Sequence, residues 1–163
     1  MMKHSIRTFC AVAILGVASY SPLQAATTTT TMGVSMTITA GCTVTATPMA
    51  FGTAQVLGAN VDATATVSPT CTNTTPYTVS LDIGTGATVT ARKMAGPAGA
   101  TIDYVLYRDA SRTQVWGATA GSDTVAGTGN GSAQAITVYG RVPAQSSPAP
   151  GSYADVVTAT VTY

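Results

Sequence analysis

The chain has 163 residues, a formal net charge of +1 at pH 7 and only 8% charged residues, so it has no electrostatic basis for binding nucleic acid or an anionic membrane. Its one histidine is His4, and all six acidic residues are aspartates. A chain without glutamate and with a single histidine near its start lacks the groups of the common catalytic triads, zinc sites and paired-glutamate sites, so we expect no enzyme, no cofactor and no metal.

The first 25 residues have the order of a secretory signal peptide. Basic residues at Lys3 and Arg7 precede an apolar run over residues 9–18, and a Ser-Pro break leads to Ala25. We expect residues 1–25 to be removed, with cleavage after Ala26 as the alternative. About 138 residues then remain, enough for one domain, with a formal charge of −1 from five basic and six acidic residues.

Residues 26–41 follow as a separate N-terminal segment that begins with five threonines, Thr27–Thr31. From residue 32 to 41, apolar residues take the even positions and Gly, Ser or Thr the odd ones. This alternation predicts a strand with one apolar face, formed by Met32, Val34, Met36 and Ile38, while Ala40 lies close to the domain body. The face could be buried in the chain's own domain or in a groove on another copy, and the pattern leaves both open.

Export would leave two cysteines, Cys42 and Cys71, in an oxidising compartment, since Cys10 lies in the predicted signal peptide. A Cys42–Cys71 disulfide is therefore expected. By closing a loop of roughly 30 residues it would stabilise the fold by about 3 to 4 kcal/mol.

Residues 42–163 show short runs of β-branched and aromatic residues between Gly, Pro, Asn and Ser clusters, which is typical of an all-β sandwich with very low helix content. The clearest alternation runs from Tyr77 to Ile83. The predicted strands are Cys42–Ala46, Ala63–Val67, Tyr77–Ile83, Thr88–Lys93, Ile102–Tyr107, Ala135–Val142 and Val156–Tyr163.

Two groups of side chains could carry binding chemistry. The aromatic residues could form a sugar-binding face, although aromatics at strand spacing are more often core residues. They are Tyr104, Tyr107, Trp116, Tyr139 and Tyr153. Asp103, Asp109 and Asp123 lack the dense spacing of a calcium loop and are expected in turns or on the surface. An aspartate pair of the aspartic-protease type stays formally possible, but none of the six lies in a recognisable catalytic motif.

Three stretches together resemble a known family. They are Cys42–Gly52 (CTVTATPMAFG), Tyr104–Asp109 (YVLYRD) with Thr113 and Trp116-Gly117, and Gly151–Asp155 (GSYAD) before the terminal strand. In order and spacing, almost the whole exported chain is similar to the spore coat protein U domain, the pilin family of archaic, Csu-type chaperone-usher pili.

The resemblance implies an incomplete immunoglobulin-like sandwich that lacks its last strand and is completed by donor-strand exchange. Residues 26–41 would donate their strand, with Met32, Val34, Met36 and Ile38 filling the groove of a neighbouring subunit. We expect the terminal strand of domain 42–163 to form one wall of that groove. The wall residues would be Val157, Ala159 and Val161. The implied partners are other copies or related pilins, a periplasmic chaperone and an outer-membrane usher, with export to a cell-surface fimbrium.

The preferred function is therefore a structural subunit of a surface fibre that supports adhesion and biofilm formation. Two alternatives remain open from the sequence. One is a secreted carbohydrate-binding or adhesin module, and the other is a spore or cell coat component assembled by similar strand exchange.

Overall fold

The computed structural model describes residues 24–163, so the predicted signal peptide lies almost wholly outside the described residues. Residues up to Met36 and residues from Thr37 onward form separate units. In the first unit, residues 24–36 have no regular secondary structure and are exposed to solvent. Within the described part of the chain, no helix is long and apolar enough to cross a membrane.

The second unit is built from eight strands. They are β1 (Cys42–Ala46), β2 (Val61–Cys71), β3 (Pro76–Leu81), β4 (Arg92–Ala95), β5 (Thr101–Tyr107), β6 (Val125–Thr128), β7 (Ile136–Val142) and β8 (Ala159–Thr162). A single 3₁₀ turn, η1 (Pro97–Gly99), is the one helical element among residues 24–163. The all-β prediction and the prediction of very low helix content are confirmed for these residues.

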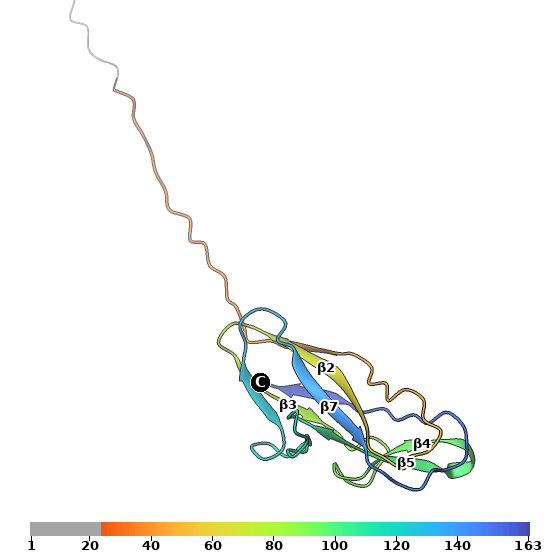
Figure 1. Cartoon of the computed structure of the whole chain (residues 1–163). Helices are drawn as coiled ribbons and strands as arrows, with labels where there is room; N and C mark the ends of the chain where they lie inside the picture. The colour runs from red at the N-terminus through yellow and green to blue at the C-terminus, as the bar shows by residue number, and fades with distance from the viewer. Residues whose placement is uncertain (1–23) are drawn as a thin grey trace, which may run out of the picture. The chain divides into compact units, whose positions relative to one another are not determined.

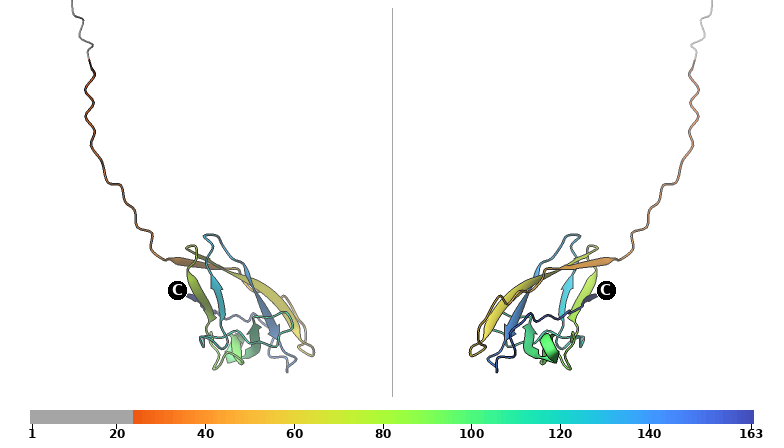
Figure 2. Two further views of the ribbon diagram at one scale, coloured as in Figure 1. Left: turned by 90° about the vertical axis from the view of Figure 1, so that its left-hand side faces the viewer. Right: turned by 90° about the vertical axis from the view of Figure 1, so that its right-hand side faces the viewer.

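Two antiparallel sheets form the layers of the domain (Figures 1 and 2). The larger has the strand order β1-β2-β7-β5-β4, and the smaller has the order β6-β3-β8. Cys42, the first residue of β1, pairs with Cys71 at the end of β2, and Thr162 of β8 pairs with Thr78 near the start of β3. Because the chain turns directly from β2 into β3, Cys42 and Thr162 lie at the same end of the domain. We call this the Cys42 end.

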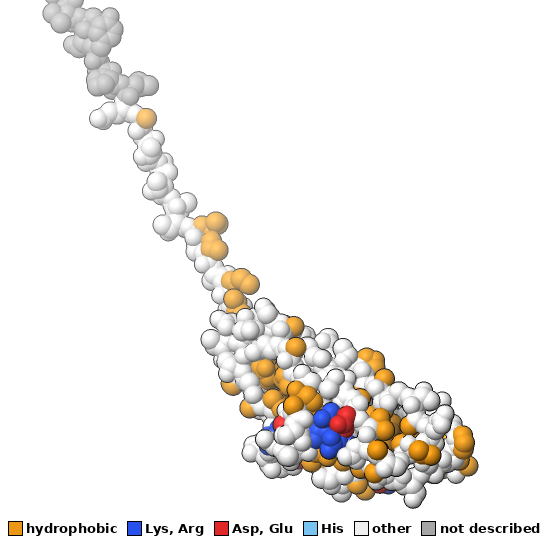
Figure 3. All heavy atoms as spheres, viewed as in Figure 1, with side chains coloured by type: hydrophobic (Ala, Val, Ile, Leu, Met, Phe, Trp, Pro, Cys, Tyr) orange, Lys and Arg blue, Asp and Glu red, His pale blue; other side chains and the backbone are white. Residues whose placement is uncertain are grey.

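The core lies between the sheets and follows their alternation. In β3, Tyr77, Val79 and Leu81 are buried while the residues between them are partly exposed. Leu106 of β5 and Val138 of β7 belong to the same cluster. Outside the core the surface is largely uncharged, and Figure 3 shows how few charged side chains one face carries.

Most predicted strands are confirmed, but two predictions were wrong in detail. Residues 88–91 are not part of a strand, because β4 runs from Arg92 to Ala95, and the terminal strand is limited to Ala159–Thr162. The sequence reasoning missed β6, a four-residue strand that contains Ala126 and Gly127. Residues of this kind do not indicate a strand in the sequence, and β6 is held in the sheet by its pairing with β3.

The predicted disulfide is present between Cys42 and Cys71, which face each other in the β1–β2 register. It therefore fixes the start of β1 to the end of β2.

Candidate functional site

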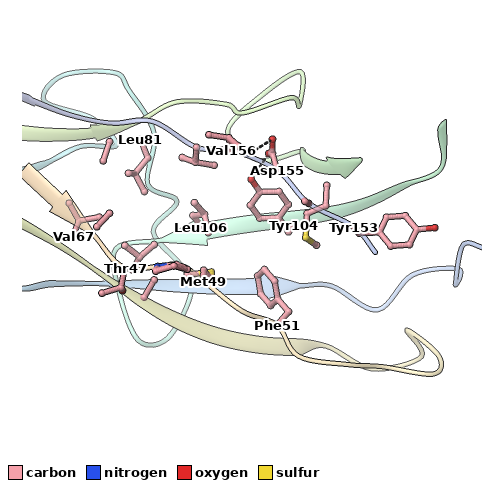
Figure 4. Close-up of a pocket in the computed structure, with 18 residues that line it drawn as sticks. Thr47, Met49, Phe51, Val67, Leu81, Tyr104, Leu106, Tyr153, Asp155 and Val156 are labelled. Atoms are coloured by element: carbon pink, nitrogen blue, oxygen red, sulfur yellow. Dashed lines mark hydrogen bonds between the residues drawn. The ribbon is translucent and has the colours of Figure 1, made fainter. Parts of the chain in front are cut away.

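A cavity of about 570 Å³ opens between two segments that face each other across it and are not paired as strands (Figure 4). One wall is formed by residues 46–51, which continue from β1, and the other by residues 153–159, which lead into β8. Core side chains form its floor, among them Val67, Leu81, Leu106 and Val138. The domain thus has an apolar groove where its two sheets are not joined.

A second cavity of about 890 Å³ extends the groove away from the Cys42 end. The two cavities share the side chains of Met49, Phe51, Met94 and Tyr153. Residues 49–57 and 147–153 form the walls of the second cavity. Its far end is closed where the backbone N–H of Leu57 donates to Ser147 Oγ at 2.8 Å. We call this the Leu57 end.

Gly140 of β7 allows the first wall to lie close over the large sheet. A Cβ atom at this position would lie 2.2 Å from Met49 Sδ and 2.9 Å from Phe51 Cζ. Both distances are too short for a real Cβ contact, so a side chain at this position would displace the ends of the Met49 and Phe51 side chains. The shape of the groove therefore depends on a residue that is not part of its lining.

Asp155 anchors the second wall. Its carboxylate accepts hydrogen bonds from Tyr104 Oη at 2.5 Å, from the backbone N–H of Thr85 at 3.0 Å and from the backbone N–H of Val156 at 2.8 Å. Burial, together with this hydrogen bond to Asp155, raises the pKa of the Tyr104 hydroxyl above its usual range. The pair connects the groove wall to its floor (Figure 4).

Asp82 holds the same wall closer to β8. It accepts from the backbone N–H groups of Thr158 at 2.9 Å and Gly84 at 3.0 Å. Burial by itself raises the pKa of the Asp82 carboxyl, but these hydrogen bonds outweigh it and leave the pKa below its usual value.

Arg92 lies fully buried below this wall. Its guanidinium donates to the carbonyl oxygens of Asp82, Val89, Leu81 and Trp116, at 2.9, 2.8, 3.3 and 2.8 Å respectively. Burial lowers the pKa of this group, but an arginine stays charged in proteins, and the carbonyl dipoles compensate for the lost water. Arg92 therefore has a structural role, connecting the end of β3 to the segments around Val89 and Trp116.

The predicted donor face is exposed in the N-terminal segment. Met32, Val34 and Met36 are 84%, 85% and 87% exposed, and Ile38 is 75% exposed. Their side chains alternate with Gly33, Ser35 and Thr37 along a segment without regular structure. Four large apolar side chains, one at every second residue, are thus exposed and available to contact another protein surface.

Among the predicted groove residues, Val157 and Ala159 line the first cavity. Val161 packs against the core cluster but does not line either cavity. Sequence reasoning missed Met49 and Phe51, which sit in the first wall, and the Tyr104–Asp155 pair, although it singled out Tyr104.

The other candidate residues have structural positions. Trp116 is fully buried and donates from Nε1 to the Val79 carbonyl at 3.1 Å. The guanidinium carbon of Arg112 lies 5.8 Å from the centre of the Tyr139 ring. Tyr139 of β7 is also the register partner of Tyr107 in β5. Tyr153 Oη donates to the Ala149 carbonyl at 2.6 Å.

The three aspartates that were considered for calcium, and expected instead in turns or on the surface, do not form one site. Asp103 pairs with Lys93 at 2.5 Å, Asp109 accepts hydrogen bonds within its own turn from Thr113 and Gln114, and Asp123 accepts from the backbone of Thr119. In the described range 24–163, no three His, Cys, Asp or Glu side chains are close enough to hold a metal ion.

The sequence of the chain from residue 28 to residue 160 matches the family model of the Spore Coat Protein U domain. The chain belongs to this family. The match includes most of the N-terminal segment, both groove walls and all strands up to β8, so the groove and the alternating segment both lie within the Spore Coat Protein U domain.

A solved structure with a similar fold is the CsuC–CsuE chaperone–tip adhesion subunit pre-assembly complex from archaic chaperone-usher Csu pili of Acinetobacter baumannii. The TM-score is 0.54 at 19% sequence identity, and the likeness covers 78% of this Spore Coat Protein U domain chain and 41% of the other chain. It shows a shared fold, consistent with an incomplete immunoglobulin-like sandwich. A comparison with curated proteins found no match.

Proposed function

We propose that this chain is a non-catalytic, structural pilin subunit of a chaperone-usher surface fibre, and that it polymerises by donating residues 26–41 to the groove of a neighbouring copy or related pilin. The observation that carries the proposal is the pairing of an open apolar groove with an exposed alternating segment in one chain. Membership of the Spore Coat Protein U domain family and the fold shared with a chain of a Csu pilus complex support it.

The four apolar side chains suit the groove in chemistry and number. Burying Met32, Val34, Met36 and Ile38 at about 1.5 to 3 kcal/mol each gives roughly 6 to 12 kcal/mol before the cost of ordering the segment. An added strand also supplies hydrogen bonds to the backbone of the groove walls. In the described wall segments outside β1 and β8, only Ala154 is bridged to a strand, at Ala95 of β4. Such a joint is long-lived.

An open groove with unpaired edges is an aggregation hazard before assembly. We therefore propose that a periplasmic chaperone covers the groove and that an outer-membrane usher receives the subunit. Residues 1–25 direct export in this proposal, and the fibre at the cell surface supports adhesion and biofilm formation.

Burial argues against a carbohydrate-binding module built on the aromatic residues. Trp116 is 0% and Tyr104 4% exposed, so neither ring face can stack on a sugar. The groove floor uses Tyr104 as a packing residue, which suits strand insertion.

The proposal is tested by expressing the chain with its chaperone in a periplasm and comparing detergent resistance of the fibres. Val34→Asp with Met36→Asp places charge on the apolar face, whereas Ser35→Asp with Thr37→Asp places the same charge on the opposite face of the segment. We expect detergent-resistant ladders from the wild type and the second variant, and folded monomer from the first. A wild-type chain that stays monomeric without a chaperone would refute the proposal.

A further inference from the structure

The segment from Tyr153 to Val161 has a strict alternation that continues beyond the groove into β8. Its odd-numbered residues are half-buried and its even-numbered residues are exposed. Within the described residues, β8 pairs with β3 at one edge and has no hydrogen-bonded strand at its other edge, since the small sheet has the order β6-β3-β8, although β1 of the large sheet lies close to it. The free edge therefore extends from the groove wall to the C-terminus of β8.

The lengths of the two segments suggest a register for an incoming strand. The first cavity is lined from Tyr153 to Ala159, a span of seven residues, and the donor face from Met32 to Ile38 also spans seven. Directly opposite residues in an antiparallel pair point to the same face of a sheet. Pairing Met32 with Ala159 and Ile38 with Tyr153 therefore directs every apolar donor residue to the same side as the half-buried wall residues.

Repeated addition of copies requires this antiparallel direction. The donor segment is joined through residues 37–41 to Cys42, and so to the Cys42 end of its own domain. Antiparallel insertion places the incoming domain at the Leu57 end of the acceptor, whereas parallel insertion would place it at the Cys42 end, to which the acceptor's own N-terminal segment is covalently joined. Only the antiparallel arrangement leaves one free end for each further copy.

The same register aligns the threonine run with β8. Thr31 falls opposite Thr160 and Thr29 opposite Thr162, both of which are exposed. On the other side of β8, these residues already pair with Ser80 and Thr78 of β3. Thr30 falls opposite the half-buried Val161, and Thr28 falls opposite the exposed Tyr163.

We propose that Thr28–Thr31 of one copy extend the donated strand along β8 of the next copy, beyond the apolar groove. This inference rests on the proposed function. On the outer face it creates two three-strand rows, Ser80–Thr160–Thr31 and Thr78–Thr162–Thr29. Threonine has high strand propensity and pairs well with threonine across strands, whereas a flexible spacer would be rich in glycine and serine. The threonine run is thus part of the joint, and Thr27, which falls beyond Tyr163, is not.

A pair of cysteines tests the register in assembled fibres of the full chain. Thr29→Cys with Thr162→Cys places two thiols directly opposite each other between copies, and Thr29→Cys with Thr158→Cys is the matched control, displaced by four residues on the same face. We expect a boiling-resistant ladder on non-reducing gels that a reductant removes, with the first pair alone. Fibres that assemble but show no ladder, or a ladder with the control pair alone, overturn the register.

A second measurement covers the case in which the added cysteines disturb folding. Replacing Thr28–Thr31 with Gly-Ser-Gly-Ser should lower the temperature at which detergent dissociates the fibres, while replacing them with four valines should not. Equal dissociation temperatures for the wild type and both variants overturn the inference and leave the proposed function standing. Absence of fibres from the wild type refutes the proposed function itself.

Discussion

The contact between Tyr104 Oη and Asp155 ties the floor of the groove to its wall, and its loss should destabilise the domain by a measurable coupling. Asp155→Ala removes three hydrogen bonds to one carboxylate. The bond from the buried Tyr104 hydroxyl is charge-assisted and is expected to contribute about 1.5 to 3 kcal/mol, with less from the two backbone donors. A total loss of about 3 to 5 kcal/mol in the free energy of unfolding follows.

A double-mutant cycle isolates the pair. Tyr104→Phe alone should cost about 1.5 to 3 kcal/mol, and the cost of Asp155→Ala should fall by a similar amount once the hydroxyl is gone. Asp155→Asn is the shape-matched control and should lie between the wild type and the alanine variant. Because Trp116 is the one tryptophan of the chain and is fully buried, its fluorescence reports urea unfolding directly.

The cycle should be measured on the non-polymerising Val34→Asp, Met36→Asp background, so that assembly does not contribute to stability. Distant, independent sites are additive to within about 0.3 to 0.5 kcal/mol. A coupling energy within that range would show that the hydroxyl and the carboxylate do not depend on each other, and the account of the groove wall given above would be wrong.

Three further predictions concern the disulfide, alkaline pH and the groove wall. Replacing both Cys42 and Cys71 with serine should lower the free energy of unfolding by about 3 to 4 kcal/mol, because the bond closes a loop with a sequence separation of 29; an unchanged urea midpoint contradicts this. The raised pKa of Tyr104 adds stability that is fully present below the unfolded-state pKa of about 10 and is lost as the pH rises toward the folded-state pKa. Above about pH 10 the urea midpoint should therefore fall less steeply with pH in Tyr104→Phe than in the wild type, and equal slopes for the two proteins contradict this. Gly140→Ala pushes a methyl group into the groove wall and should reduce the detergent-resistant ladder, whereas Gly58→Ala, with open space around its Cα, should not; equal ladders from both count against the assigned wall.

The fold class and most strands could be predicted because period-two alternation depends on local sequence alone. Cys42–Ala46 was predicted with its observed bounds, and the Cys42–Cys71 pairing followed from the count of exported cysteines. The bounds predicted for β4 were wrong because residues 88–91 form a turn, closed by the hydrogen bond from the backbone N–H of Ala91 to the Thr88 carbonyl, before the strand begins at Arg92. The burial of Arg92 could not be predicted either. A sequence pattern assigns arginine to the solvent side, and only the carbonyl groups from three other segments explain its burial.

The groove was harder to predict than the strands. Val157 and Ala159 follow from alternation, but Met49 and Phe51 belong to a segment without regular structure that packs onto Gly140. The Tyr104–Asp155 contact joins residues 51 positions apart, so no local pattern reports it. Long-range packing places these residues, and a single sequence does not display it.

The position of the disulfide determines how the domain carries mechanical load. Tension arriving through the N-terminal segment reaches the fold at Cys42, where the covalent bond passes it at once to Cys71 of β2. β2 is 11 residues long and is paired on both sides, with β1 and with β7. The short edge strand β1 therefore cannot be peeled from β2 one hydrogen bond at a time, and in the proposed fibre tension bypasses β1 and enters the domain through β2.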